Sequence, residues 1–179
     1  MNMKSSVYSL SVFDKKPDEV VYLAKKYQCD GIEWWCTENG HINLSNLISS
    51  AKEVSKITSE SGLLCAGIAP YFTYNETKEY LAKIFEVAQI LHTRNVRCHS
   101  YIFDGSVSVE DLITKQRKWL EDIVLPQAEK ADVRINIEQH HNMICCTPNA
   151  CRCLIDGLPE RHIGIIFDPG NSAVEGFTR

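Results

Sequence analysis

Residues 133–171 read VRINIEQHHNMICCTPNACRCLIDGLPERHIGIIFDPGN. Two short apolar runs, Val133–Glu138 and Ile163–Phe167, lie on either side of a stretch with the signals of a single helix. The dipeptide Thr147-Pro148 is typical of a helix N-cap and the first helical residue. This part of the chain therefore predicts one strand–helix–strand unit in which the two strands are parallel.

The same alternation runs through the rest of the chain. Helical stripes of apolar residues separate six apolar runs, which predict strands over Ser6–Phe13, Gly31–Trp35, Leu63–Ile68, Val96–Phe103, Val133–Glu138 and Ile163–Phe167. The runs are nearly continuous in apolar residues, as expected for parallel strands buried on both faces. We find no linker, so we expect a single domain over residues 1–179. Periodicity alone is compatible with two architectures, a doubly wound open sheet and a (β/α)8 barrel. No Gly-x-Gly-x-x-Gly follows the first strand, so nothing supports a Rossmann cofactor site.

Composition excludes several classes of function. A net charge of -4 and a pI near 5.9 argue against a protein that binds nucleic acid. No apolar run approaches the roughly 20 residues that a membrane helix needs, and the first residues lack the features of a signal peptide. We therefore expect a cytoplasmic protein whose eight cysteines are reduced thiols. Cys151 and Cys153 would point about 200° apart on a helix, so we do not expect the Cys145–Cys153 run to bind a metal.

Polar residues gather where the predicted strands end, which is where ligands bind in both architectures. Glu138 and Asp168 directly follow two consecutive buried strands. Adjacent strand ends lie close together, and two carboxylates that converge need a cation between them or a proton on one of them. A hard divalent metal with oxygen ligands satisfies this need. Each carboxylate could alternatively cap the helix that follows it.

Three motifs in order carry a resemblance to a known family: Gly31-Ile-Glu-Trp34, Ile137-Glu138-x-His140 and Phe167-Asp-Pro-Gly-Asn171. Together they resemble the xylose isomerase-like barrel superfamily of sugar phosphate isomerases and epimerases, over essentially the whole chain. The resemblance implies an α/β fold of the (β/α)8 TIM-barrel type. It also implies four metal ligands on strands five to eight, of which Glu138 and Asp168 match the first two. The other two would lie past Arg179, so we expect an incomplete barrel that lacks the last two βα units.

The resemblance further implies the chemistry. A divalent ion (Mn²⁺, Mg²⁺ or similar) would act as a Lewis acid on an enediolate, while Glu138 transfers a proton at the carbon next to the carbonyl. Substrate contacts are expected from residues at the strand ends, which are Glu33, Trp34, His41, His99, His140 and Asn171. Trp34, which could stack on a sugar, could alternatively fill the barrel interior or a helix interface, and His99 could alternatively be a core histidine. His140 shares strand parity with Glu138, so we expect His140 rather than His141 to face the pocket. Asn171 stands at a position where some branches of the superfamily have a histidine.

The expected partner is a small-molecule sugar or sugar phosphate, with no nucleic acid and no membrane. Three alternatives stay open. A polyol-ketone dehydratase shares the first chemical step. A truncated, inactive chain would leave apolar strand edges that could pair with another copy in a homo-oligomer. An apurinic endonuclease is disfavoured, because Ala69-Pro-Tyr71 and Asn171 stand where that class needs histidines.

Overall fold

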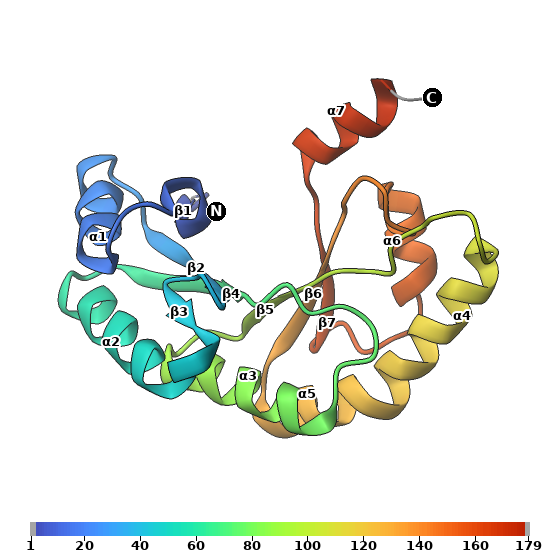
Figure 1. Cartoon of the computed structure of the whole chain (residues 1–179), viewed down its shortest axis with the longest axis horizontal. Helices are drawn as coiled ribbons and strands as arrows, with labels where there is room; N and C mark the ends of the chain where they lie inside the picture. The colour runs from blue at the N-terminus through green and yellow to red at the C-terminus, as the bar shows by residue number, and fades with distance from the viewer. Residues whose placement is uncertain (1–2, 178–179) are drawn as a thin grey trace. The chain divides into compact units, whose positions relative to one another are not determined.

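Strands and helices alternate along the computed structural model, which describes residues 3–177 (Figure 1). The strands are β1 (Ser6–Tyr8), β2 (Gly31–Thr37), β3 (Ile42–Asn43), β4 (Leu64–Ala69), β5 (Asn95–Cys98), β6 (Arg134–Glu138) and β7 (Ile163–Ile166). The α-helices are α1 (Pro17–Lys26), α2 (Leu47–Glu60), α3 (Lys78–Ile90), α4 (Val109–Trp119), α5 (Leu125–Ala131), α6 (Pro148–Ile155) and α7 (Pro169–Phe177). Two 3-10 turns, η1 (Ser9–Val12) and η2 (Leu44–Asn46), and one π-helical segment, η3 (Leu120–Val124), complete the order. The strands pair in parallel, which confirms an α/β protein with an incomplete barrel-type sheet in the described residues.

The chain divides into two compact units. One holds the residues up to Tyr71 together with Lys83–Val96, and the other holds Phe72–Ala82 and the residues from Arg97 onward. The sequence predicts a single domain, and whether the two units act as one stays a prediction. None of the helices in residues 3–177 is both long and apolar enough to cross a membrane.

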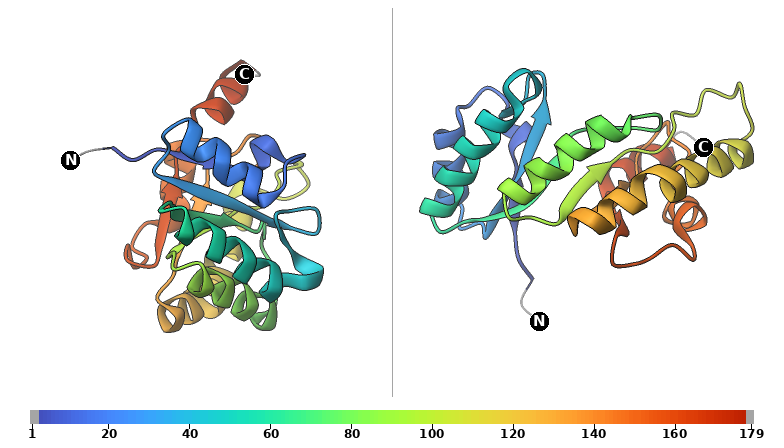
Figure 2. Two further views of the ribbon diagram at one scale, coloured as in Figure 1. Left: turned by 90° about the vertical axis from the view of Figure 1, so that its left-hand side faces the viewer. Right: turned by 90° about the horizontal axis from the view of Figure 1, so that it is seen from below.

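In the first unit, β2 lies between β1 and β4, and β4 pairs with the start of β5. Helices α1 and α2 pack against each other and against β2 and β4 (Figure 2). Strand β2 alternates as a strand covered by helices should. Ile32, Trp34 and Cys36 are fully buried, whereas Glu33 and Trp35 are half-buried on the other face.

In the second unit, β6 and β7 pair in register, with Glu138 opposite Ile166. Helix α6 packs against α4 and β7. The predicted helix start is confirmed, because the Thr147 hydroxyl accepts the N–H of Ala150. The helix α6 ends before Gly157, whose φ is 75°. Glycine adopts this left-handed conformation without a steric penalty, so it suits the residue after a helix.

Two predicted strands are too long. The first ends at Tyr8 because the next residue, Ser9, is fully buried and its hydroxyl accepts the N–H of Trp35, replacing a ladder carbonyl. The chain then turns into η1. The fourth predicted strand ends at Cys98, because the N–H groups beyond it bond elsewhere. His99 donates its backbone N–H to the carbonyl of Phe72, and Tyr101 donates its own to the side chain of Gln116.

Candidate functional site

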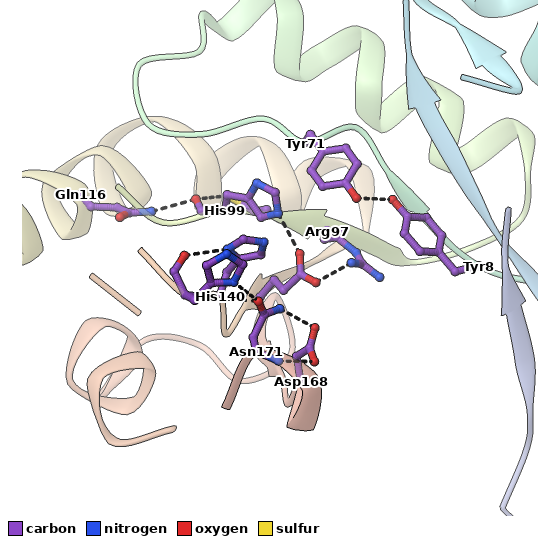
Figure 3. A network of polar contacts seen from close by, with 11 residues as sticks. Tyr8, Tyr71, Arg97, His99, Gln116, His140, Asp168 and Asn171 are labelled. Atoms are coloured by element: carbon purple, nitrogen blue, oxygen red, sulfur yellow. Dashed lines mark hydrogen bonds and ion pairs between the residues drawn. The ribbon is translucent and has the colours of Figure 1, made fainter. Parts of the chain in front are cut away.

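Glu138 is the last residue of β6, and its carboxylate is paired with Arg97 and His99. Ile135 and Ile137 fill the opposite face of the strand and are fully buried. The residue Glu138 is 4% exposed, and both of its carboxylate oxygens have partners. Arg97 Nη1 donates to Oε1 at 2.6 Å, and His99 Nε2 lies 2.7 Å from Oε2 (Figure 3). The structure thus brings together Glu138 and His99, two of the predicted site residues.

The two partners of Glu138 decide its protonation. Burial by itself raises the pKa of this carboxyl, but the hydrogen bond to His99 and the charge of Arg97 together outweigh burial. The pKa of Glu138 is therefore lowered, and the side chain is ionised at neutral pH.

The backbone of the second unit fixes His99 in turn. Its N–H is donated to the carbonyl of Phe72, and its carbonyl accepts the side-chain amide of Gln116 at 3.2 Å. Gln116 is fully buried on α4, so that helix anchors the chain just beyond β5 (Figure 3).

Asp168 follows β7 and caps α7. Its Oδ1 accepts the backbone N–H of Asn171 at 3.0 Å, and its Oδ2 accepts the side-chain amide of Asn171 at 2.6 Å. The Asp168 carbonyl also accepts the N–H of Ser172. The capping role that the sequence left open is therefore present, and Asn171 is an immediate neighbour of Asp168 (Figure 3).

Both carboxylates stand at the carboxyl edge of the β6–β7 pair. Gln139 donates its N–H to the carbonyl of Ile166, and Asp168 follows two residues later. Within residues 3–177, no group of three or more His, Cys, Asp or Glu side chains is arranged to hold a metal ion. That Glu138 and Asp168 share a metal stays a prediction.

Three imidazoles form a row beside these carboxylates. The His99 and His140 rings are 5.4 Å apart between centroids, and the His140 and His141 rings stack at 4.4 Å. His141 Nδ1 forms a short hydrogen bond with the side-chain oxygen of Asn171. The parity argument that chose His140 over His141 fails, because β6 ends at Glu138 and alternation stops there.

Three other predicted residues belong to the first unit. His41 Nε2 lies 3.0 Å from the carbonyl of Lys15, and burial lowers the pKa of His41 despite that contact. Glu33 is half-buried on the β2 face opposite Trp34. Trp34 is fully buried, and its indole N–H is donated to Thr58 of α2 at 3.2 Å. Of the two roles left open for Trp34, the structure shows the helix-interface role, because the ring is buried between the strand and α2.

The sequence analysis missed Arg97. Arg97 is two residues before His99, so both share a face, and a lone arginine in a short apolar strand was the available signal. In the first unit, the hydroxyl groups of Tyr8 and Tyr71 lie 2.7 Å apart (Figure 3).

Solved structures with a similar fold cover nearly all of this chain. The 3-keto-D-glucoside 4-epimerase YcjR from E. coli has a TM-score of 0.76 at 15% identity, over 97% of this chain and 71% of that one. The probable 3-DHS dehydratase AsbF from Bacillus anthracis has a TM-score of 0.75 at 15% identity, over 97% and 66%. The IOLI protein with a binding zinc atom has a TM-score of 0.75 at 13% identity, over 97% and 66%. The chain thus spans about two thirds of the length of these proteins.

No curated protein matches the sequence significantly. The family model that does match is the xylose isomerase-like TIM barrel, over residues 21–178. This match includes most of both compact units and every predicted site residue. The chain belongs to the xylose isomerase-like TIM barrel family.

Proposed function

We propose that the chain is a metal-dependent sugar or sugar-phosphate isomerase or epimerase, in which Glu138 transfers a proton at the carbon next to a carbonyl. The observation that carries the proposal is the buried Glu138 carboxylate held between Arg97 and His99. A general base must be ionised and fixed in position before the substrate arrives. Membership of a family whose structural neighbours include an epimerase supports the same chemistry.

The donor chemistry of the site suits a hard divalent ion such as Mn²⁺ or Mg²⁺. Glu138 and Asp168 offer carboxylate oxygens from adjacent strand ends, which such ions prefer. To bind the ion, Glu138 would exchange contacts with Arg97 and His99, and Asp168 would exchange those with Asn171. Water would fill the remaining positions. When bound, the ion would supply Lewis-acid polarisation of the substrate carbonyl.

The side chains around Glu138 divide the other work. Before an ion binds, Arg97 and His99 hold the carboxylate in one orientation, and they also keep it a weak base through its lowered pKa. A substrate oxygen that draws either group away would raise the basicity of Glu138 at the moment of proton transfer. His140, which packs on His99, is proposed to contact a sugar hydroxyl.

The remaining residues are proposed to contact substrate in each unit considered by itself. In the second unit, Asn171 offers side-chain atoms between His141 and Asp168. In the first unit, Glu33 and His41 keep their proposed roles, while Trp34 does not, because its ring is buried against α2.

A polyol-ketone dehydratase is the second candidate. Its reaction starts with the same proton abstraction and continues with loss of a hydroxyl group as water. Because the fold is also similar to that of a probable dehydratase, the experiment below is designed to detect dehydration as well as epimerisation.

Solvent exchange measures the shared step directly. The protein is incubated in D₂O with Mn²⁺ and a panel of ketoses, 3-keto sugars and their phosphates, and ¹H NMR follows the proton next to the carbonyl. We expect exchange that Glu138→Gln abolishes and that the exposed-site control Glu86→Gln retains. An epimer signal would identify the epimerase, and an enone absorption would identify the dehydratase. Equal exchange in Glu138→Gln and the unmodified protein would contradict the proposal.

Metal binding is a separate readout. Calorimetry with Mn²⁺ alone compares the unmodified chain with Glu138→Gln/Asp168→Asn and with the exposed control Glu86→Gln/Asp156→Asn. We expect binding that only the first double variant loses. Binding that survives Glu138→Gln/Asp168→Asn would place the metal elsewhere.

A further inference from the structure

A cavity of about 260 Å³ lies in the second unit, at the amino end of β7. It forms where η3 and α5 face the turn that leads into that strand. The residues that line it are Glu121, Leu125, Pro126, Glu129, Pro159 and His162. Pockets for drug-sized ligands usually measure about 300–1,000 Å³, so this cavity suits a smaller molecule. None of its residues belongs to the candidate functional site.

Hydrogen bonds hold His162 in one orientation at this cavity. Its backbone N–H is donated to the Pro159 carbonyl at 2.8 Å, its carbonyl accepts the N–H of Ile135 at 2.9 Å, and its ring Nδ1 lies 2.9 Å from the Val133 carbonyl. Because a carbonyl oxygen only accepts, Nδ1 carries the hydrogen, and Nε2 of the neutral ring is an acceptor. His162 is 7% exposed, and Nε2 has no partner among residues 3–177. The free acceptor of a buried ring in the cavity wall therefore lacks a donor.

Two carboxylates line the same cavity. Glu129 is exposed, and its side chain has no hydrogen bond or ion pair with the other described residues. Glu121 Oε1 accepts from Arg117 Nε at 3.1 Å, which leaves its Oε2 for a ligand. Arg161, on the turn before β7, is already paired with Asp132 at 2.8 Å. Neither arginine is therefore available to neutralise Glu129.

The backbone around the cavity adds acceptors rather than donors. Pro126 and Pro159 have no N–H. The N–H of Leu125 is donated to the Leu120 carbonyl, which is the π-helical bond of η3. The Glu121 carbonyl therefore receives no helical bond from the residues four and five places after it. The polar side-chain atoms of the lining are all acceptors as well, so the lining selects a ligand that donates.

We propose that this cavity binds a small-molecule amine, through a primary ammonium group on a short alkyl chain. An ammonium has three N–H donors, which match the carboxylates of Glu121 and Glu129 and the Nε2 of His162. The methylene groups of the ligand would lie against Leu125 and Pro126. The inference does not depend on the proposed enzyme activity, because the cavity shares no residue with that site.

A bare metal ion fits this cavity less well than an organic cation. In the part of the chain that the structure describes, no group of three or more His, Cys, Asp or Glu side chains is arranged to hold a metal ion. Hydrogen bonds from an ammonium span about 2.7–3.2 Å between heavy atoms, whereas metal–oxygen bonds are shorter, at about 2.0–2.6 Å. The acceptors of an ammonium can therefore stand farther apart than metal ligands.

Titration of the intact ¹⁵N-labelled protein with butylamine tests the proposal by NMR. The control is 1-butanol, which has the same alkyl chain without the charge. We expect butylamine to shift amide signals within residues 121–129 and 159–162, and 1-butanol to leave them nearly unchanged. Raising the salt concentration from about 0.05 M to about 0.5 M should weaken the binding, because the attraction is between charges. No shift at these residues, or equal shifts with 1-butanol, would overturn the proposal.

Variants at exposed positions assign the binding to the cavity without a risk to folding. Glu129→Gln keeps the size of the side chain and removes its charge, so we expect butylamine to bind about fivefold more weakly. Glu86→Gln, which removes an exposed charge from α3, is the matched control and should bind as the unmodified protein does. Equal affinity in Glu129→Gln and Glu86→Gln would show that the cavity is not the amine site.

Discussion

Arg97 Nη1 lies 2.6 Å from Glu138 Oε1, and the two side chains are 10% and 6% exposed. Each therefore offsets the charge of the other in a buried setting. His99 adds a second contact at 2.7 Å on the other carboxylate oxygen. The charged base of the proposed reaction is therefore also a structural element of the second unit.

Arg97→Met should destabilise the protein strongly. It removes the cation and leaves Glu138 buried with one partner, and breaking a buried ion pair in this way costs about 3–5 kcal/mol. The control is Lys118→Met, in an exposed pair with Asp122, where we expect about 0–1 kcal/mol. Urea unfolding measures both. A loss for Arg97→Met no greater than for the control would show that the pair contributes little.

Acid should weaken the second unit through Glu138. Because the pKa of Glu138 is lowered in the folded protein, its contribution is fully present above the unfolded value, near 4.5, and is lost as the pH falls through the lower folded value. The free energy of unfolding should therefore fall more steeply below pH 4.5 in the unmodified protein than in Glu138→Gln. Parallel curves for the two proteins would contradict this assignment.

Asp168→Asn and Asp168→Ala should separate the two roles of Asp168. Asparagine keeps an oxygen for the N–H of Asn171 but loses the charge, so α7 stays capped while Mn²⁺ binding is lost. Alanine loses both, at an additional cost of about 1 kcal/mol. Thermal unfolding and calorimetry on the same samples measure the two effects. Unchanged Mn²⁺ affinity in Asp168→Asn would remove Asp168 from the proposed metal site.

Trp34→Phe and Trp35→Phe should differ although the residues are adjacent. The Trp34 indole N–H is donated to Thr58, and the ring is fully buried, so its replacement loses packing and a hydrogen bond, at about 2–3 kcal/mol. The Trp35 indole N–H is buried with no partner in the described structure, so losing it should change stability by less than about 1 kcal/mol. Urea unfolding of both variants checks this order, and the reverse order would assign the core role to Trp35.

Much of the architecture could be read from the sequence because its signals are local. These signals are apolar runs of strand length, helical stripes between them and a capping residue such as Thr147, and they depend only on nearby residues. The predicted ends of two strands were wrong because hydrogen bonds with residues distant in sequence end those strands early. The Ser9 hydroxyl ended β1, and the Phe72 carbonyl helped to end β5, and neither partner is close in sequence to the group it bonds.

The sequence by itself determined the order of parallel strands and helices and the positions of Glu138 and Asp168 at two consecutive strand ends, because strand period and buried runs are written in adjacent residues. Only the tertiary structure decided what those carboxylates contact. Arg97 and His99 reach Glu138 across about forty residues, and the row of His99, His140 and His141 forms only after β6 has ended. Charge pairing depends on distance in space, and a single sequence does not specify that distance.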